Sequence, residues 1–285
     1  MASMADLKKR RESIQSTGQI TRAMKLVATV KLQKARQKAE KGKPYNKLLY
    51  DTMSSIMAYS RGISHPYING NGAKKKAVIV ITSNRGLAGG YNANIVRMVT
   101  SSPKLPKEDT VIYALGKKGR ELLVRRGYAQ ATDLSDIINA PMFSDAFVLT
   151  EMLIREYDAG NIGEVYIAYS AFINTVTQQP RLVRLLPIDT ENVDIDREAQ
   201  APMNFESDEE EALSALIPKY MTNYIYGAFN EAVASENGAR MQAMDSATSN
   251  VEEIMEDLEL EYNRARQSSI TQELTEIIAG ANAIG

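Results

Sequence analysis

Apolar positions near the start of the chain predict a long helix. Residues 1–60 contain strong helix formers and no proline before Pro44. We expect Gly42 and Pro44 to bend or break this helix, so that a second helical piece runs from Tyr45 to about Ser60. One narrow apolar stripe follows a spacing of three and four residues. Its members are Ile20, Ala23, Val27 and Val30, and the small residues Ser13 and Ser16 continue it.

Residues 208–285 carry a second helical pattern. Apolar residues recur there every seven positions, which is typical of a helix that packs along another helix. At about 1.5 Å per residue, some 75 helical residues would extend roughly 110 Å, too far for one domain of this size to bury. Much of this helix is therefore expected to be covered by a partner or to stand in water beside the N-terminal helix. The seam consists of Met244, Val251, Leu258 and Ala265, flanked by Met241, Ala247 and Ile254, and Ile270, Leu274, Ile277 and Ala281 extend it to the C-terminus.

Between the two helical ends, residues 74–188 alternate strand and helix patterns. Turn residues are dense in residues 61–73, and residues 189–207 are polar, so both segments are interpreted as linkers. The alternation predicts a Rossmann-like α/β domain with a mostly parallel sheet. The expected strands are Ala77–Thr82, Val111–Leu115, Val165–Ser170 and, at a sheet edge, Arg181–Ile188. The expected helices are Tyr91–Thr100, Lys117–Arg126 and Ser144–Ala159, the last with Ser144 as its N-cap.

The two helical ends carry opposite charge. Asp6–Lys43 holds twelve Lys and Arg against three acids, whereas Glu206–Gly285 holds sixteen acids against four Lys and Arg. Two long helices with apolar stripes and opposite charge are suited to lie against one another. The sequence therefore predicts a fold of class α/β plus a long coiled coil, in which the terminal helices form a rod.

Composition excludes several kinds of site. The chain has no Cys and one His, so disulfides, thiolate metal sites, His-based metal sites and catalytic triads are all excluded. His65 is expected to be a solvated loop residue. The acidic run at residues 208–211 is interpreted as first-turn acids that favour the helix dipole, in preference to a cation site. With no apolar run of about 18 residues and no apolar signal-peptide core, we expect a soluble protein on the cytoplasmic side.

The turn Thr82–Asn92 is rich in glycine and joins a strand to a helix. Such turns can hold phosphates, because backbone N–H groups and the helix N-terminus face an anion. This one matches neither GxxxxGK[ST] nor GxGxxG, so a tight turn that needs positive φ is favoured over a nucleotide site. No cofactor is expected.

No pair of titratable groups marks an acid–base site, so the residues alone predict a non-enzymatic coiled-coil rod with an α/β head. The basic N-terminal helix could bind nucleic acid, but it lacks aromatics to stack on bases, and the acidic C-terminal helix would share its surroundings. Two rival hypotheses stay open: a coiled-coil scaffold or tether, and an α/β nucleotide-binding enzyme with helical arms.

Three stretches go beyond this class-level interpretation. They are SIQSTGQITRAMKLVA at Ser13–Ala28, ITSNRGLAGGYNAN at Ile81–Asn94, and a C-terminal pair formed by Arg240–Asp245 and Tyr262–Ala281. Together they closely resemble the gamma subunit of F-type ATP synthases, and the likeness runs from end to end of the chain.

The resemblance implies a rotor subunit of a bacterial enzyme. The terminal helices would form an antiparallel coiled coil whose tip penetrates a ring of three alpha and three beta subunits. The α/β domain would sit beside the epsilon subunit and on the c-subunit ring. Flow of protons or sodium ions would turn the c ring and this chain, and so drive ATP synthesis or hydrolysis on the beta subunits. The chain itself would carry no catalytic residue, and it would meet the cytoplasmic face of the cell membrane only through the complex.

The resemblance also implies residues that contact the alpha–beta hexamer. Met24 and Lys25 resemble the family's contact with a beta-subunit loop. Further positions resemble those that couple rotation to catalysis, and the planar fork of an Arg suits binding to carboxylates on a moving loop. These positions are Arg240, Arg266, Gln267, Thr271 and Glu273.

Two positions depart from the family pattern. Asn84 stands where the family usually has Asp, which is expected to weaken a local charge contact, and Ala88 stands where Cys is frequent. The dithiol insertion of the chloroplast form is missing, so regulation through thiols is excluded.

Overall fold

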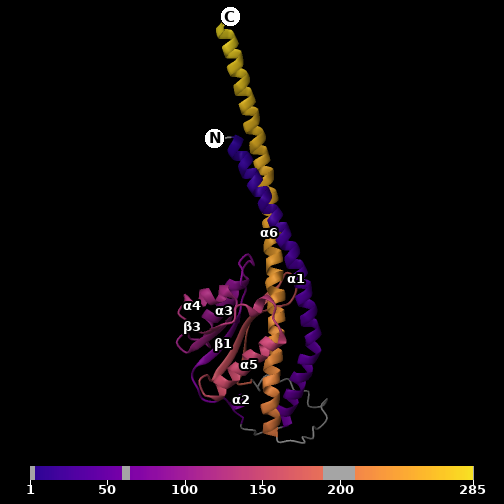
Figure 1. Cartoon of the computed structure of the whole chain (residues 1–285), viewed down its shortest axis with the longest axis vertical. Coiled ribbons are helices and arrows are strands. Elements are labelled where there is room, and N and C mark those ends of the chain that lie inside the picture. The colour runs from indigo at the N-terminus through magenta and orange to yellow at the C-terminus, as the bar shows by residue number, and fades with distance from the viewer. Residues whose placement is uncertain (1–3, 60–64, 189–208, 285) are drawn as a thin grey trace. The chain divides into compact units, whose positions relative to one another are not determined.

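A computed structural model describes residues 4–59, 65–188 and 209–284 (Figure 1). Helix α1 (Met4–Tyr59) and helix α6 (Glu209–Ile284) each contribute to two compact units. The first unit contains the part of α1 up to Ala28 and the part of α6 from Met241 onward, and the second spans Thr29–Arg240. The predicted linker at residues 189–207 lies outside the described residues.

The first unit is an antiparallel pair of helices, which we call the helix pair. Thr21 of α1 shares a hydrogen bond with Thr248 of α6. One turn further along α1, Lys25 forms an ion pair with Asp245, which lies nearly one turn before Thr248 on α6. Partner numbers that fall as α1 numbers rise define antiparallel packing. The predicted antiparallel arrangement of the terminal helices is thus confirmed, and α6 continues beyond the start of α1 (Figure 1).

Helix α1 runs without a break through Pro44, so the predicted break at Gly42–Pro44 and a separate second helical piece are wrong. A proline inside a helix costs about 3 kcal/mol, because it removes one hydrogen bond and crowds the preceding turn. Later turns of α1 offset this cost by burying Met53, which is 2% exposed, in the core of the second unit.

The second unit is built on a five-stranded sheet with the order β3-β2-β1-β4-β5. β1, β2, β3 and β4 are parallel, and β5 pairs antiparallel to β4 at one edge. The mostly parallel sheet and the edge position of the last strand are confirmed. The strands are β1 (Lys76–Ile81), β2 (Thr110–Leu115), β3 (Ala129–Asp133), β4 (Glu164–Phe172) and β5 (Gln178–Leu186).

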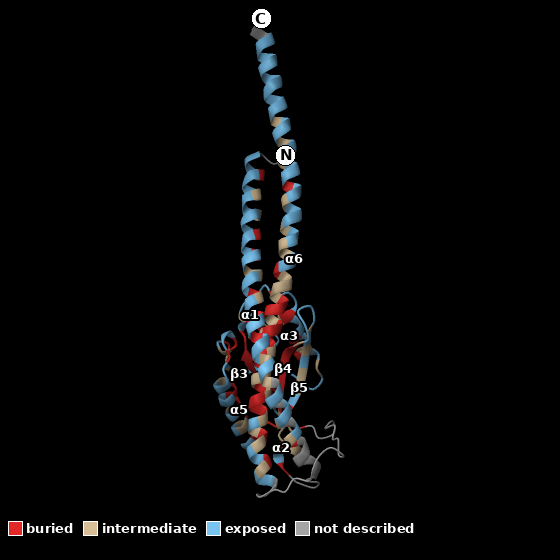
Figure 2. Ribbon diagram, turned by 90° about the vertical axis from the view of Figure 1, so that its right-hand side faces the viewer, coloured by how far each residue is buried: buried red, intermediate tan, exposed pale blue. Residues whose placement is uncertain are grey.

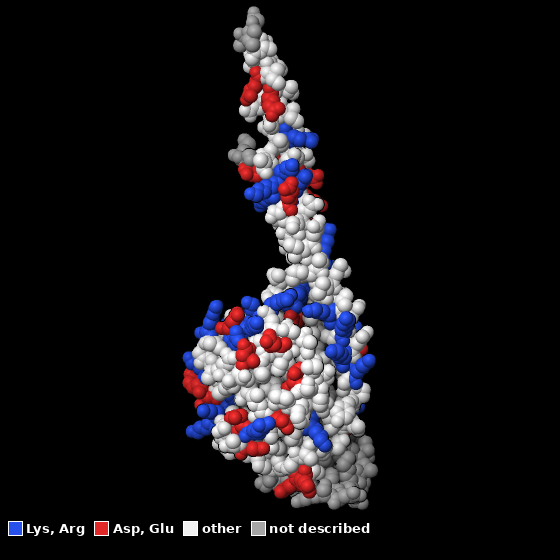
Figure 3. Space-filling view, in the orientation of Figure 1, with Lys and Arg blue, Asp and Glu red and all other residues white. Residues whose placement is uncertain are grey.

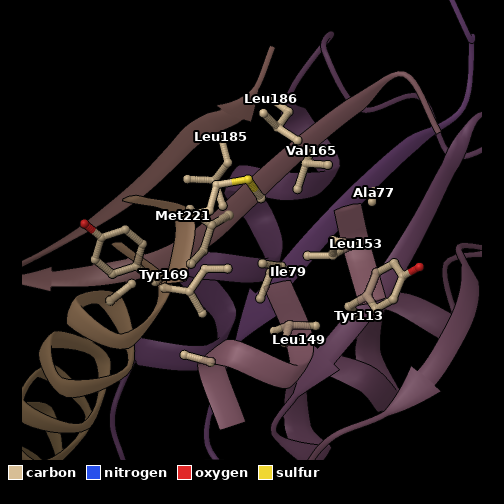
Figure 4. Packing of buried hydrophobic residues seen from close by; sticks show 14 of the residues in the cluster. Ala77, Ile79, Tyr113, Leu149, Leu153, Val165, Tyr169, Leu185, Leu186 and Met221 are labelled. Carbon is tan, nitrogen blue, oxygen red and sulfur yellow. The ribbon is translucent and has the colours of Figure 1, made fainter. Parts of the chain in front are cut away.

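Helices cover both faces of this sheet (Figure 2). Alternate residues of β1 point to opposite faces, so Ile79 belongs to one buried cluster and Val80 to the other. On the Ile79 face lie α5 (Phe143–Asp158) and the part of α6 from Leu213 to Ala232. Figure 4 shows Leu149 and Leu153 of α5 in this cluster, together with Met221 of α6.

The opposite face is covered by α3 (Tyr91–Ser101) and α4 (Lys117–Val124). The remaining short helices are α2 (Pro66–Asn69) and the 3₁₀ turn η1 (Ile137–Asn139).

Two local predictions are corrected. Strand β3 was missing from the expected elements, because Ala129–Asp133 is largely exposed and has no apolar alternation to mark it. Helix α5 begins at Phe143, so Ser144 lies within its first turn and is not its N-cap. Asp145 accepts a hydrogen bond from the Met142 N–H at 2.8 Å and stabilises this end instead.

Candidate functional site

The seam of the helix pair on α1 differs from the stripe that the sequence indicated. Ile20, Val27 and Val30 are 58%, 57% and 52% exposed, and Ala23, Ser13 and Ser16 are exposed as well. That prediction is therefore wrong. The buried positions of α1 in the first unit are Leu7, Gly18, Thr21 and Ala28, of which only Leu7 is large and apolar.

On α6 the predicted seven-residue repeat does face inward. Met244 and Leu258 are buried, and Val251 and Ala265 are half-buried. Of the predicted flanking positions, Met241 and Ala247 are half-buried, whereas Ile254 is exposed.

Small side chains let the two helices approach closely. A Cβ placed on Gly18 would lie 2.8 Å from Val251 Cγ1, well inside ordinary contact. Thr21 Oγ1 and Thr248 Oγ1 share a hydrogen bond of 2.8 Å. This seam therefore depends on close fit as well as on apolar area.

Lys and Arg lie beside Asp and Glu on the surface of the helix pair (Figure 3), and two ion pairs join its helices next to the seam. Arg22 pairs with Glu252 at 2.6 Å, and Lys25 pairs with Asp245 at 2.5 Å. All four side chains are 42–62% exposed, and exposed pairs of this kind contribute about 0–1 kcal/mol each. The opposite charges of the two helices thus favour register and orientation more than stability.

Large apolar side chains remain exposed on the outer faces of the helix pair. On α1 these include Leu26 at 68% exposure, beside Ile20 and Val27. On α6 every described side chain from Arg266 to Asn282 except the half-buried Ser269 is exposed. This stretch, which we call the terminal arm, includes the exposed Ile270, Leu274, Ile277 and Ile278.

Exposed contiguous apolar surface on a soluble protein commonly marks a contact with another molecule. The predicted site residues Arg266, Gln267, Thr271 and Glu273 all lie on the terminal arm and are exposed. Met24 and Lys25 are half-buried beside the seam, where Lys25 pairs with Asp245 of the same chain.

Arg240 lies in a different environment from the other predicted site residues. Its side chain is 12% exposed and pairs with Glu236, which is 14% exposed, at 2.6 Å. Its second terminal nitrogen donates to the carbonyl oxygens of Gly86 at 3.3 Å and Arg85 at 3.5 Å. Within this chain, Arg240 thus joins α6 to the Gly-rich turn at Thr82–Asn92.

The Gly-rich turn binds one of its own backbone donors. Asn92 Oδ1 accepts from the Ser83 N–H at 2.9 Å, a donor that a phosphate would otherwise require. Leu87 and Gly89 have φ of 61° and 53°, so the expected positive φ is confirmed. The carbonyl oxygens of Arg85 and Gly86 accept hydrogen bonds from the Arg240 guanidinium. A phosphate site would instead present N–H donors to an anion.

Asn84 joins this turn to two neighbouring segments. Its Nδ2 donates to Ser135 O at 2.7 Å and to Asn139 Oδ1 at 3.2 Å. Its Oδ1 accepts from the Lys117 N–H at 2.9 Å, at the start of α4. An Asp carboxylate could accept this last bond but could not make the two donations, so the amide supplies contacts of its own.

His65 is buried, so the prediction of a solvated loop residue is wrong. Its Nδ1 accepts from the Tyr67 N–H at 3.1 Å and begins α2, which leaves Nε2 to donate to Ser214 Oγ at 2.8 Å. Burial lowers the pKa of His65, while Glu210 and then Asp158 act in the opposite direction. The turn residues around His65 had indicated that its side chain is exposed to solvent, whereas its hydrogen bonds join α2 to α6.

Two further features bear on function. Among the described residues, no group of three or more His, Cys, Asp or Glu is placed to hold a metal ion. No helix in the described ranges combines the length and the apolar character needed to cross a bilayer.

Comparisons with known proteins agree on one family. Residues 3–284 match the family described as ATP synthase. The chain is 57% identical over 292 aligned positions to the ATP synthase gamma chain of Lachnoclostridium phytofermentans, with both chains covered in full. It is 42% identical to the gamma chain of Alkaliphilus metalliredigens, over 99% of this chain and 98% of that one.

Solved structures share the fold. The rotor of the Euglena gracilis mitochondrial ATP synthase matches with a TM-score of 0.65 at 18% identity, covering 94% of this chain and 98% of that chain. The central stalk and c ring of the Tetrahymena thermophila mitochondrial ATP synthase match with a TM-score of 0.58 at 22% identity, over 80% and 99% of the two chains.

Proposed function

This chain belongs to the gamma-chain family of ATP synthases, and from that membership we propose that it is the rotating central-stalk subunit of a bacterial F-type enzyme. Rotation inside the hexamer of alpha and beta subunits would couple movement of protons or sodium ions through the c ring to ATP synthesis or hydrolysis. The chain has a mechanical role in this proposal, and the chemistry takes place on the beta subunits.

The terminal arm is the observation that carries the proposal. An isolated helix in water needs no exposed Ile and Leu side chains, yet Ile270, Leu274, Ile277 and Ile278 are each 48–67% exposed. Such a surface is stable in a protein when another molecule covers it. A rod inserted into a ring of subunits would be covered on all sides, which matches exposure around the whole circumference of the arm.

Of the seven positions that the resemblance indicates, we assign the hexamer contact to six and give Arg240 a separate role below. The six are Met24, Lys25, Arg266, Gln267, Thr271 and Glu273. For a rotor, such contacts need only favour one beta-subunit conformation over the others at each angle. Arg forks such as that of Arg266 can bind a carboxylate at one angle and release it at the next.

The remaining assignments follow from the same proposal. Residues 1–60 and 208–285 would form the shaft, and residues 74–188 would form the domain that meets the epsilon subunit and the c ring. The protein would lie at the cytoplasmic face of the cell membrane, held there only through the complex, with no cofactor and no nucleic-acid partner.

Co-expression with the matching alpha and beta subunits tests this function. We expect one copy of the chain to co-elute with each ATP-hydrolysing hexamer. Truncation after Tyr262, which removes the terminal arm, should abolish the chain's effect on hydrolysis. A chain that elutes alone as an elongated particle would instead support a coiled-coil scaffold.

A further inference from the structure

The sheet has a topological switch point between β1 and β4. From β1 the chain adds β2 and β3 on one side, whereas β4 and β5 lie on the other. In open α/β sheets the crevice outside the carboxyl ends of the two strands at such a point is where ligands bind. In this protein the Gly-rich turn follows β1 at that position, so the fold would place a ligand beside it.

Helix α6 occupies this crevice. Ser235 Oγ donates to the carbonyl oxygen of Ser170, near the carboxyl end of β4, at 2.8 Å, and both residues are buried. Tyr91, at the start of α3, donates its hydroxyl to Ala232 O at 3.3 Å. One helix is thus bonded to the segments that follow β1 and to β4 itself.

Close packing supports the same placement. A Cβ on Gly238 would meet Gln178 Nε2 at 3.3 Å and Phe172 Cε2 at 3.6 Å, the latter at the last residue of β4. Ala232 belongs to the buried cluster on the α5 side of the sheet, whereas Ala239 belongs to the cluster on the α3 side. Within seven residues, α6 therefore passes from one face of the sheet to the other, around the carboxyl ends of its strands.

Arg240 completes these contacts. Its guanidinium is held by Glu236, and both side chains are largely buried. The guanidinium also donates to the carbonyl oxygens of Arg85 and Gly86, and these hydrogen bonds hold the Gly-rich turn against α6. An Arg is suited to this arrangement, because its planar fork can bind a carboxylate and carbonyl oxygens at the same time.

We propose that the switch-point crevice holds α6 as an internal ligand and is the joint that fixes this helix to the α/β domain. Arg240 acts there as a positioning residue, which orders the Gly-rich turn from inside the chain instead of contacting the hexamer. The part of this proposal that concerns coupling rests on the function proposed above. In this proposal α6 takes the place of the ligand that this fold would bind at the switch point.

The joint has a mechanical consequence. If the α/β domain is turned by a ring beneath it, the bonds and contacts between the domain and α6 carry torque to that helix. Ser235 hydrogen-bonds α6 to β4, whereas Tyr91 and Arg240 hydrogen-bond it to the segment that follows β1, which comprises the Gly-rich turn and the start of α3. Loss of one of these bonds should let the domain shift against the helix under load.

The test compares Arg240→Ala, Arg240→Lys and a matched control in the full chain and in the assembled membrane complex. Arg155→Ala is the control, because Arg155 also forms an ion pair with a Glu four residues away but is 78% exposed. Hydrogen exchange of the amides at residues 83–90 reports the order of the turn. The ratio of ion pumping to ATP hydrolysis in reconstituted vesicles, followed with a membrane-potential dye, reports the coupling.

We expect exchange in the turn to be about tenfold faster in Arg240→Ala. Arg240→Lys should restore little of this protection, because it keeps the pairing with Glu236 but lacks the second terminal nitrogen that donates to the turn. The pumping ratio should fall about twofold or more in Arg240→Ala and be unchanged in Arg155→Ala. Tyr91→Phe, which deletes only the hydroxyl that donates to Ala232 O, should also lower the pumping ratio.

Unchanged exchange in Arg240→Ala would overturn the positioning role and would favour an outward contact. Faster exchange with a normal pumping ratio would overturn the role of the joint in coupling. If the chain fails to assemble with the other subunits, the function proposed above fails, whereas the exchange measured on the full chain alone still decides how Arg240 acts.

Discussion

Gly18 offers the sharpest test of the helix pair. Its missing Cβ allows α1 to approach Val251 of α6, since an added Cβ would lie 2.8 Å from Val251 Cγ1, where ordinary contact begins at 3.4 Å. Gly18→Ala would force the two helices apart by about 0.6 Å or displace Val251, and small-to-large changes of this kind cost about 1–3 kcal/mol.

Helix propensity acts in the opposite direction, because Ala stabilises a helix interior by about 1 kcal/mol relative to Gly. Gly42 isolates this term: it lies in the same helix, and a Cβ there would have nothing within 4 Å. Gly42→Ala should therefore stabilise the chain by about 0.5–1 kcal/mol. The difference between the two substitutions should be about 1–3 kcal/mol and measures the contact with Val251.

Urea unfolding of the purified chain, followed by far-ultraviolet circular dichroism, gives these free energies. Val251→Ala should rescue Gly18→Ala, so that the double variant is more stable than the sum of the single changes by about 1 kcal/mol or more. If Gly18→Ala and Gly42→Ala have the same effect, or if Val251→Ala brings no rescue, the close approach of these helices is refuted.

Three further results are expected. Gly119→Ala places a Cβ 2.5 Å from the Thr82 side chain, so thermal denaturation should show a loss of about 2 kcal/mol or more. Because the pKa of His65 is lowered in the folded state, unfolding free energy should decrease as the pH falls below about 6.5, and His65→Asn should flatten that slope in urea titrations at several pH values. Arg22→Gln should cost less than about 1 kcal/mol in the same assay, since its pair with Glu252 is more than half exposed; a larger loss would contradict the account of the flanking charges.

The sheet could be predicted from sequence because its central strands are buried on both faces. Ala77–Ile81 reads as a continuous apolar run, and all five residues are fully buried. Strand β3 could not be found in this way. Residues Ala129–Asp133 are held by pairing to β2 while their side chains remain largely in water, so the sequence shows no pattern of burial.

The helix pair shows a different limit of hydrophobic patterning. On α6, Met244 and Leu258 are large, and the repeat correctly indicates the buried face. On α1 the seam at Gly18, Thr21 and Ala28 is made of small residues, because they permit close approach, and the larger Ile20 and Val27 face outward. A rule that seeks the most apolar stripe chooses the wrong face in such a case.

Sequence likeness indicated positions for the candidate site but not the environment of each side chain. Sequence likeness identified Arg240 and the terminal arm, but it could not distinguish a residue that faces a partner from one that faces its own chain. Arg266 is exposed and suits an outward contact, whereas the side chain of Arg240 is only 12% exposed and pairs with Glu236 of the same helix. Ser235 and Tyr91, which complete the joint, carried no signal beyond ordinary helix and turn residues.

Direct observation of rotation tests the central claim. The chain contains no Cys, so Lys107→Cys on the exposed surface of the α/β domain creates a unique attachment point for a visible probe. With the hexamer of alpha and beta subunits fixed to a surface and ATP supplied, the account predicts that the probe turns continuously in one direction. A probe that stays fixed, or turns without preferred direction while ATP is hydrolysed, would contradict it.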